Sequence, residues 1–340
     1  MRRIVTVGAI AVVTVLSSGT AALACGSLVA ANGAVQLVRT STLAAFHDGV
    51  EHYVTSFEFA GATESFGSII PLPGEPTKVE RGGDWTLQRL QREVSPPVLA
   101  SPSSDSAEAA TGKVEVLLQT RIDSLDVSIL KGGGRDVATW AAENGFTLTG
   151  DTPAVLEFYS SRSPYFMAAR FDQAAAVAQG LGGGDGIPVH LTIPVERPWV
   201  PLRILATGKP ADEIVSADVF LLTDREPSLL HGDGVTVARS EPASASLLDD
   251  LRADKGMAWV PEAAWLTFAQ VQAPVRDLTY DLAINASGGT PDPRDAGMVA
   301  LAAIVTEPSE RTAVAVVMLL AVGGLTLTMV RRRVRIRARA

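Results

Sequence analysis

The chain has a single cysteine, Cys25, among its 340 residues. A disulfide within one chain needs two cysteines, so the sequence excludes the cross-linked frameworks that stabilise many exported domains. Stability must come from a hydrophobic core, and residues 25–311 are numerous enough to bury one. For Cys25, three fates stay open: a lipid attachment, a free thiol, or a disulfide to another chain. Ala22 disfavours lipid attachment, because bacterial lipidation prefers a large aliphatic residue three positions before the cysteine.

Catalytic signatures are also missing from the sequence. It contains no G-x-S-x-G elbow, no S-x-x-K with its partner motifs and no G-K-[ST] phosphate loop. The glycine-rich runs that begin at Gly132 and Gly182 lack the acidic and basic residues of calcium-binding and nucleotide-binding loops. The sequence therefore predicts no catalytic, cofactor-binding or metal-binding residue.

Histidine is scarce as well, with four residues in the chain. His47 and His52 flank an expected hairpin turn that also holds Asp48 and Glu51. Such a group can bind a metal ion, or can pair histidine with carboxylate as a hydrolase does. The simpler interpretation is that these are solvated residues around a turn. The other two histidines are expected in a core or edge strand and in a turn: His190 and His231.

Aromatic residues make up only 6% of the chain. The tryptophans can form either a platform for a ligand or part of the core: Trp85, Trp140, Trp199, Trp259 and Trp265. Trp85 and Trp140 fall on expected amphipathic helices, where core packing is the usual role.

An export signal begins the chain. Arg2 and Arg3 are followed by an apolar run at Ile4–Leu16 and by the small-residue cleavage site Ala22-Leu23-Ala24. This order is typical of a secretory signal peptide. We therefore expect residues 1–24 to be removed, which leaves Cys25 as the first residue.

The C-terminal stretch predicts a membrane anchor. Ala313 to Val330 is free of charge for 18 residues, and a helix of this length approaches the thickness of a bilayer core. We expect a transmembrane helix at 312–330 and a basic cytoplasmic tail at 331–340. Arginines retain a tail on the cytoplasmic side, and six follow the helix: Arg331, Arg332, Arg333, Arg335, Arg337 and Arg339. The expected localisation is the plasma membrane, in single-pass type I topology with the N-terminal domain outside. No L-P-x-T-G motif precedes the anchor, so the helix should be retained.

The exported region is strongly acidic. The whole chain carries −8, and the signal and tail hold eight arginines with no acid, so the rest is near −8 − 8 = −16. This charge repels nucleic acid and anionic lipid. It either attracts cations and basic partners or keeps an exposed domain soluble.

Strand patterns dominate the exported region. Alternating or short apolar runs predict strands that include Tyr53–Ala60, Phe66–Ile70, Val114–Thr120, Leu125–Leu130, Pro164–Phe171, Pro188–Pro194, Leu202–Ala206, Ile214–Thr223, Trp265–Val271 and Leu278–Ile284. Short helices are expected at Trp85–Val94 with an Asp84 cap, at Val137–Glu143, at Ala154–Tyr159 and at Ser246–Arg252.

This order of elements predicts a sheet-dominated α+β fold with a few short helices. The expected extracytoplasmic domain is 25–286, with either one unit or two that meet near 206–214. Residues 287–311 are rich in glycine, proline and charge at their start and are expected to form a juxtamembrane stalk.

Several motifs occur in an order that resembles a known bacterial family. They are Cys25-Gly26, Phe66-Gly-Ser-Ile-Ile-Pro-Leu-Pro-Gly-Glu-Pro, Trp140-Ala-Ala-Glu-Asn-Gly-Phe, Tyr159 with Tyr165-Phe-Met-Ala-Ala-Arg, and Trp199-Val-Pro-Leu-Arg-Ile. Together, over about residues 25–206, they resemble the family catalogued as domain of unknown function 2330. The chain departs from it at Ser27, where a second glycine is often seen, and lacks a second cysteine for any family disulfide. The resemblance implies an exported, envelope-associated protein and brings no activity, cofactor or site residue.

These observations favour a membrane-anchored extracytoplasmic module that binds or organises other components of the bacterial envelope. The expected partners are an envelope protein or cell-wall ligand and, through the anchor, the lipid bilayer, but no nucleic acid. The alternative is an envelope enzyme, hydrolase-like, that uses carboxylates with His47 or His52. A third interpretation anchors the chain at both ends, through a lipid on Cys25 as well as the helix.

Overall fold

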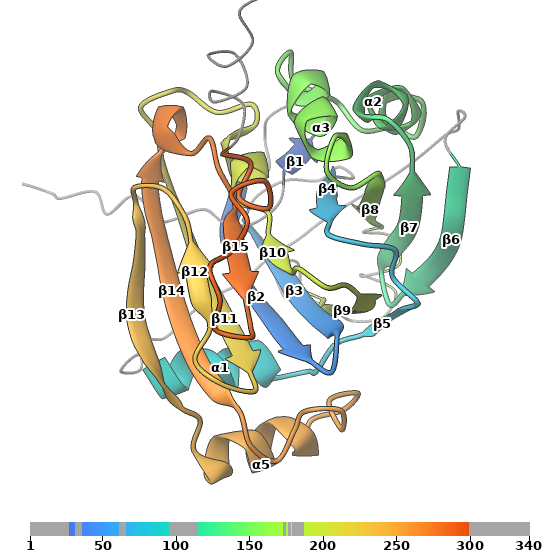
Figure 1. Cartoon of the computed structure of the whole chain (residues 1–340). Helices are drawn as coiled ribbons and strands as arrows, with labels where there is room; N and C mark the ends of the chain where they lie inside the picture. The colour runs from blue at the N-terminus through green and yellow to red at the C-terminus, as the bar shows by residue number, and fades with distance from the viewer. Residues whose placement is uncertain are drawn as a thin grey trace, which may run out of the picture.

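The computed structural model describes residues 27–30, 36–60, 66–94, 115–172, 175, 178 and 187–298. Within these ranges the chain forms fifteen strands in three sheets together with four short α-helices. The predicted α+β, sheet-dominated fold class is confirmed for this part of the chain. Figure 1 shows the sheets at the centre, with pairs of helices at opposite ends of the molecule.

A seven-stranded sheet forms the largest layer. Its strands, in spatial order, are β13 (Val235–Pro242), β14 (Trp265–Pro274), β11 (Ile214–Thr223), β2 (Gln36–His47), β3 (Val50–Ala60), β9 (Val189–Pro194) and β5 (Lys78–Arg81). Its pairings are antiparallel except that β11 runs parallel to β2. The predicted turn between β2 and β3 is confirmed, and it has left-handed backbone at Asp48 and Gly49.

Two smaller sheets complete the strands. The five-stranded sheet has the order β1 (Ser27–Ala30), β4 (Phe66–Leu72), β8 (Tyr165–Phe171), β7 (Leu125–Lys131) and β6 (Glu115–Ile122). The three-stranded sheet consists of β10 (Trp199–Val200), β15 (Leu282–Asn285) and β12 (Ser228–Leu230).

The helices pack in pairs. One pair is α1 (Thr86–Val94) with α5 (Ala245–Ala253), and the other is α2 (Gly134–Glu143) with α3 (Thr152–Ser160). In Figure 1 the first pair lies at the lower end of the seven-stranded sheet, and the second lies beside β7 and β8. Two short 3-10 helices are present: η1 (Arg203–Ala206) precedes β11 in the sequence, and η2 (Val275–Asp277) follows β14.

The seven-stranded sheet has a hydrophobic core on each face, because its buried positions alternate along the strands. On one face, Leu43, Val54 and Phe220 pack against Leu90 of α1 and Leu251 of α5. The opposite face joins a larger cluster that includes the five-stranded sheet and α2 and α3. Residues on both sides of 206–214, such as Leu205 and Val215, belong to that one cluster.

One predicted strand is wrong. Leu202–Ala206 forms the 3-10 helix η1, and the strand β10 precedes it at Trp199–Val200. The cause is a distant side chain, because Asp281 accepts hydrogen bonds from the backbone N–H groups of Leu202 and Arg203 at 2.7 and 3.0 Å. These donors are thereby satisfied without a neighbouring strand.

Two local expectations also need correction. The strand predicted at Phe66–Ile70 is longer than expected, because β4 continues through Pro71 to Leu72. Among the described residues, the pairing of β1 ends at Ile69 and Pro71 pairs with Phe166 of β8 alone, so its missing N–H is tolerated on the other side. Asp84 does not serve as the cap of α1, since its carboxylate pairs with Arg81. Five polar or very short strands are not predicted by the sequence patterns: β1, β5, β10, β12 and β13.

Several predictions fall outside the described residues. They are the signal peptide at 1–24, Cys25, the transmembrane helix at 312–330 and the arginine-rich tail. Within the ranges that the structure describes, no helix is long and apolar enough to cross a membrane. The start of the expected stalk, residues 287–298, packs against the domain: the Asp281 N–H donates to the Ala296 carbonyl, and Arg162 donates to the Asp295 carbonyl.

Candidate functional site

The strands β3, β9 and β5 bring a polar cluster together at one end of the seven-stranded sheet. Their register places His52, Thr192 and Lys78 in one cross-strand row. The next row on the same face, two residues along, holds His190 and Glu80. Residues opposite each other in a ladder share a face, and alternate residues of a strand share it too. His52, His190, Lys78 and Glu80 therefore lie on the face that α1 and α5 cover.

Trp259 covers the two histidines. Its ring lies parallel to that of His52, with centroids 3.9 Å apart and an interplanar angle of 5°, and it lies 5.2 Å from the His190 centroid. The His52 Nδ1 and His190 Nε2 atoms are 2.9 Å apart, which is a hydrogen bond between the rings. The three rings form one packed stack.

Both histidines are neutral near pH 7. Burial lowers the pKa of His52 to about 4, with further lowering by His47 and Lys78. Burial also lowers the pKa of His190 to about 3, with contributions from His52 and Lys78. A neutral imidazole can donate from one nitrogen and accept at the other, so the two rings can form this hydrogen bond while both stay uncharged.

Asp254, the residue after α5, fixes the loop that carries Trp259. It is 4% exposed, and its carboxylate accepts from the backbone N–H groups of Asp84 and Trp85 at 3.1 and 2.9 Å. It also accepts from the Thr86 hydroxyl at 2.8 Å. An anion at the start of α1 is favoured by the helix dipole and by the free N–H groups there. This carboxylate therefore holds the loop of residues 255–259 against the end of β5.

Two glycines line the space between these segments. Gly256 has a φ of +78°, and a Cβ on it would lie 3.1 Å from the Arg81 carbonyl oxygen. A Cβ on Gly82 would lie 3.0 Å from side-chain carbons of both Val54 and Pro188. The backbone approaches closely here because neither residue has a side chain.

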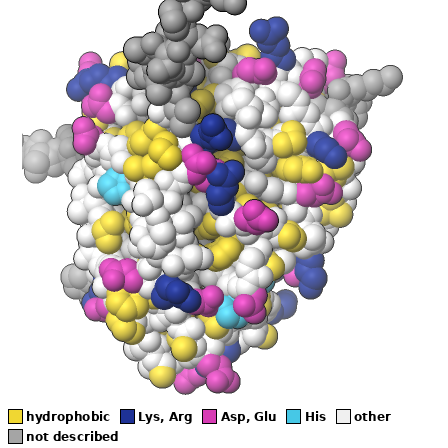
Figure 2. Space-filling view, in the orientation of Figure 1, with side chains coloured by type: hydrophobic (Ala, Val, Ile, Leu, Met, Phe, Trp, Pro, Cys, Tyr) yellow, Lys and Arg dark blue, Asp and Glu magenta, His cyan; other side chains and the backbone are white. Residues whose placement is uncertain are grey.

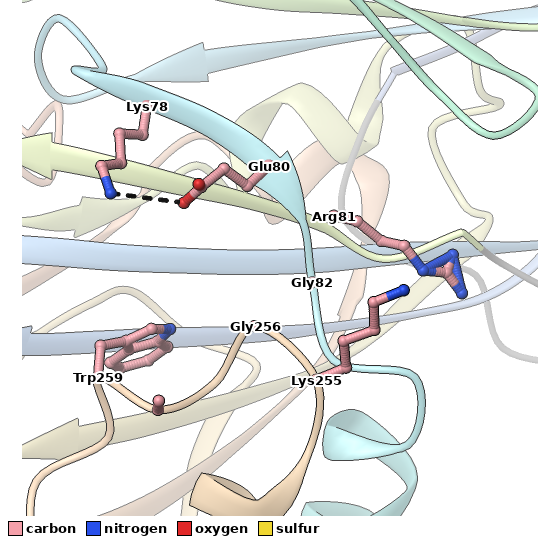
Figure 3. A pocket seen from close by; sticks show the side chains of 8 residues that line it. Lys78, Glu80, Arg81, Gly82, Lys255, Gly256 and Trp259 are labelled. Atoms are coloured by element: carbon pink, nitrogen blue, oxygen red, sulfur yellow. Dashed lines mark ion pairs between the residues drawn. The ribbon is translucent and has the colours of Figure 1, made fainter.

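The result is a pocket of about 390 Å³ (Figure 3). Its lining residues are Lys78, Glu80, Arg81, Gly82, Lys255, Gly256, Ala258 and Trp259. Figure 3 shows Lys78 and Glu80 on the Trp259 side, and Lys255 on the side of Arg81. The volume is within the range of small-ligand sites, which start at about 300 Å³.

The basic side chains of the pocket differ in how far acids neutralise them. Arg81 forms ion pairs with Asp84 at 2.6 Å and with Asp123. Lys78 Nζ lies 3.9 Å from Glu80 Oε2, at the limit of an ion pair. Lys255 has no ion pair among the residues described in the structure. Lys78 and Lys255 are thus the cations best placed to meet an anion.

The surface elsewhere mixes both signs of charge. On the face shown in Figure 2, acidic and basic side chains are interspersed among apolar ones. A second hollow, of about 760 Å³, lies where β5 and β6 approach each other, and its apolar lining includes Val79, Leu118 and Ile129.

The structure separates the residues that the sequence placed around the first hairpin. His47 is 46% exposed, contacts Asp224 through Nδ1 and lies 3.3 Å from Asp48. Glu51 is fully buried on the opposite face of the sheet from His52, between Phe46 and Ile193. In the described ranges, no group of three or more histidine, cysteine or acidic residues is arranged to hold a metal ion.

Glu51 is unusual among the buried polar residues. Neither carboxylate oxygen has a hydrogen-bond partner among the residues that the structure describes. Burial raises the pKa of this carboxyl from 4.5 to about 8, because a charge in an apolar environment has lost its hydration. Glu51 is therefore mostly protonated at neutral pH, and it does not line the pocket described above.

The sequence patterns do not indicate this site, although they include some of its residues. His190 was expected to be a core or edge residue, and it is 2% exposed, but its contact with His52 was not foreseen. Trp259 lies 69 residues further along the chain, since 259 − 190 = 69. A signal was available in the alternation of β3, which puts His52 on the same face as Val54, but nothing local indicates which strand lies beside it.

Comparison with known proteins gives a family. A sequence model for an uncharacterized protein conserved in bacteria, domain of unknown function 2330, matches residues 19–225. The chain belongs to this family. The match confirms the resemblance and extends past the motifs at both ends. It includes Lys78–Gly82 of the pocket, whereas Lys255–Trp259 lie beyond it.

No curated protein matches the sequence. Among solved structures, the chain is similar to that of baculovirus P35, at 11% identity and a TM-score of 0.38 over 75% of this chain and 93% of that one. A mutated baculovirus P35 after caspase cleavage gives 8% identity and a TM-score of 0.34, covering 74% and 95%. At these scores the likeness does not establish a shared fold.

The family motifs have structural roles where the structure describes them. A Cβ on Gly67 would lie 2.1 Å from a ring carbon of Phe146, so a residue of one motif leaves space for a residue of another. Tyr159 donates to Asp281 at 2.7 Å, and the Arg162 guanidinium lies 4.6 Å from the Trp199 ring while it also pairs with Asp281. These contacts join β4 to α2, and α3 to β10 and β15.

Proposed function

We propose that this protein is a membrane-anchored extracytoplasmic binding module of the bacterial envelope, and that the pocket beside Trp259 holds its ligand. Membership of a family conserved in bacteria supports the bacterial setting of this proposal. The expected signal peptide and C-terminal anchor support the location, with the domain outside and the arginine-rich tail inside.

The observation that carries the binding function is the pocket itself. Three basic side chains and one acidic side chain line it, whereas the exported region as a whole is near −16. Because Arg81 is paired with acids while Lys78 and Lys255 are not closely paired among the described residues, these two lysines can attract an anionic ligand to this place on an acidic domain. An aromatic ring with few polar groups around it is typical of a ligand site.

The alternative, a hydrolase that uses His47 or His52 with a carboxylate, has less support from the geometry. The imidazole of His52 is neutral and hydrogen-bonded to His190 under Trp259, and Glu51 lies on the other face of the sheet. His47 meets its carboxylates at an exposed position outside the pocket.

Affinity capture from membranes tests the binding function. The full chain, solubilised in mild detergent with the envelope fraction of its host, should retain an envelope component. Capture should fall for the double variant Lys78→Gln/Lys255→Gln and persist for Lys209→Gln, which removes a lysine that already pairs with Glu213. Equal capture by all three proteins would contradict the assignment of the pocket.

Reporter fusions test the orientation. The proposal predicts activity for a cytoplasm-specific reporter fused after Ala340. It also predicts activity for a reporter that works only outside the cytoplasm when this is inserted in the exposed turn at Asp48. The reverse pattern would overturn the type I topology.

A further inference from the structure

We infer that the ligand of the Trp259 pocket is an anionic glycan, a sugar polymer with carboxylate or phosphate groups. This inference rests on the proposed function and deepens it by naming the ligand class. Its support comes from the separation of the cations, from the backbone between them and from the position of the indole ring.

The two lysines without strong ion pairs lie on different sides of the pocket (Figure 3). Between them, Gly82 and Gly256 put backbone rather than side chains at the surface of the pocket. A small inorganic anion needs donors that converge on one point. Two separated cations with a side-chain-free strip between them fit an extended ligand that has charges at intervals.

The third feature is the tryptophan. One face of the Trp259 ring packs on His52, and the residue also lines the pocket at its Lys78 end. Because the histidine stack holds this ring, binding a ligand on it costs little side-chain entropy. A flat indole matches the face of a pyranose ring, whose C–H bonds carry a partial positive charge toward the π-electrons.

Glu80 separates a glycan from a simple polyanion. Its carboxylate lines the same pocket, where it would repel a ligand with a charge on every unit. Sugar hydroxyls, in contrast, can donate hydrogen bonds to a carboxylate. The acidic remainder of the domain disfavours dense polyanions for the same reason.

Four polymers distinguish these contributions in a binding titration of the full chain in nanodiscs of zwitterionic lipid. They are dextran, carboxymethyl dextran, dextran phosphate and poly-glutamate. We expect binding of one or both anionic dextrans, with the relative affinities showing whether carboxylate or phosphate is preferred. Neutral dextran and poly-glutamate should each bind at least about tenfold more weakly. Neutral dextran lacks the negative charges that meet the lysines, and poly-glutamate lacks the sugar rings that stack on Trp259.

Matched variants assign the binding to the pocket. Lys78→Gln/Lys255→Gln should weaken binding of the preferred anionic dextran by about tenfold or more, while Lys209→Gln leaves it unchanged. Trp259→Phe should weaken it several-fold, and Trp265→Phe, at a half-buried tryptophan on β14, should not. Circular dichroism and thermal unfolding of each variant confirm that the fold is retained.

Several results would overturn the inference: equal affinity for poly-glutamate and the anionic dextrans, equal affinity for neutral dextran, no binding of any polymer, or binding that the pocket variants do not change. The proposed function is tested apart from this, because capture of an envelope protein that depends on Lys78 and Lys255 supports a binding module while it contradicts a glycan ligand.

Discussion

Replacing Glu51 by glutamine should remove a contribution to stability that declines as the pH rises from about 5 to about 8. The side chain is fully buried, and its oxygens have no hydrogen-bond partner in the described part of the chain. Burial raises the pKa of its carboxyl from 4.5 to about 8. Between these two values the folded protein keeps a proton on Glu51 that the unfolded chain has released.

This difference in bound protons decides whether stability rises or falls with pH. Stability falls with rising pH wherever the folded state binds more protons, so the contribution of Glu51 is fully present below pH 4.5 and is lost as the pH rises through about 8. The contribution of Glu51 to the free energy of unfolding should fall by roughly 1.4 kcal/mol per pH unit across this window, on the order of 5 kcal/mol in all. Above the folded pKa the curve should become flat.

Urea unfolding of the full chain in detergent micelles, followed by tryptophan fluorescence between pH 5 and pH 9, measures this slope. Glu51→Gln keeps the shape and stays neutral, so its free energy of unfolding should lack the decline above pH 6.5. Glu157→Gln, at an exposed glutamate of α3, is the matched control and should follow the wild type. An unchanged slope in Glu51→Gln would refute the account of the buried neutral carboxyl.

The histidine stack predicts the opposite slope in acid. The pKa values of His52 and His190 are lowered from 6.5 to about 4 and about 3, so between about pH 4 and 6.5 the unfolded state binds more protons. The stability that these neutral rings contribute is therefore present above pH 6.5 and is lost as the pH falls. Together with Glu51, this predicts maximal stability near pH 6.5, and His52→Gln/His190→Gln should flatten the acid side of the profile.

Three further substitutions test how the domain is held together, each by thermal or urea unfolding. Gly67→Ala should destabilise by about 1–3 kcal/mol, because its methyl group would meet the Phe146 ring, and full stability would show that this contact is not as close as described. Asp254→Ala should cost about 2–4 kcal/mol and weaken ligand binding at the pocket as well, since the carboxylate orders the loop to Trp259, and binding without loss would contradict that role. Asp281→Asn should cost about 3–5 kcal/mol because it leaves the guanidinium of Arg162 without its buried partner, and a stability equal to that of the wild type would argue against the network.

Local patterns predicted much of the fold correctly. Ile214–Thr223 forms a strand with the expected bounds, and Asn144-Gly145 ends α2 with Gly145 at a φ of +82°. These elements follow from alternation, from turn residues and from glycine chemistry, all of which act over a few neighbouring residues. The failures occur where a distant residue satisfies the backbone, as Asp281 does for Leu202 and Arg203.

The candidate site was less accessible to prediction for the same reason. The pairing of His52 with His190 requires β9 to lie beside β3, and the pairing of both with Trp259 requires a loop from the far end of α5. The α1 cap is similar, because the expected local residue, Asp84, pairs with Arg81 while Asp254 supplies the carboxylate. None of these contacts has a signature in a short window of sequence.

What the sequence by itself determined is the class of fold, the family and the expectation of an anchored, exported domain, since composition, periodicity and runs of apolar or basic residues are local quantities. What only the tertiary structure decided is the location of the chemistry. Strand order and register put a neutral histidine pair, a tryptophan and two weakly paired lysines around one pocket, and they put Glu51 out of reach of His52 on the other face of the same strand. The physical reason is that side chains alternate faces along a strand, so neighbours in sequence separate while residues far apart in sequence meet.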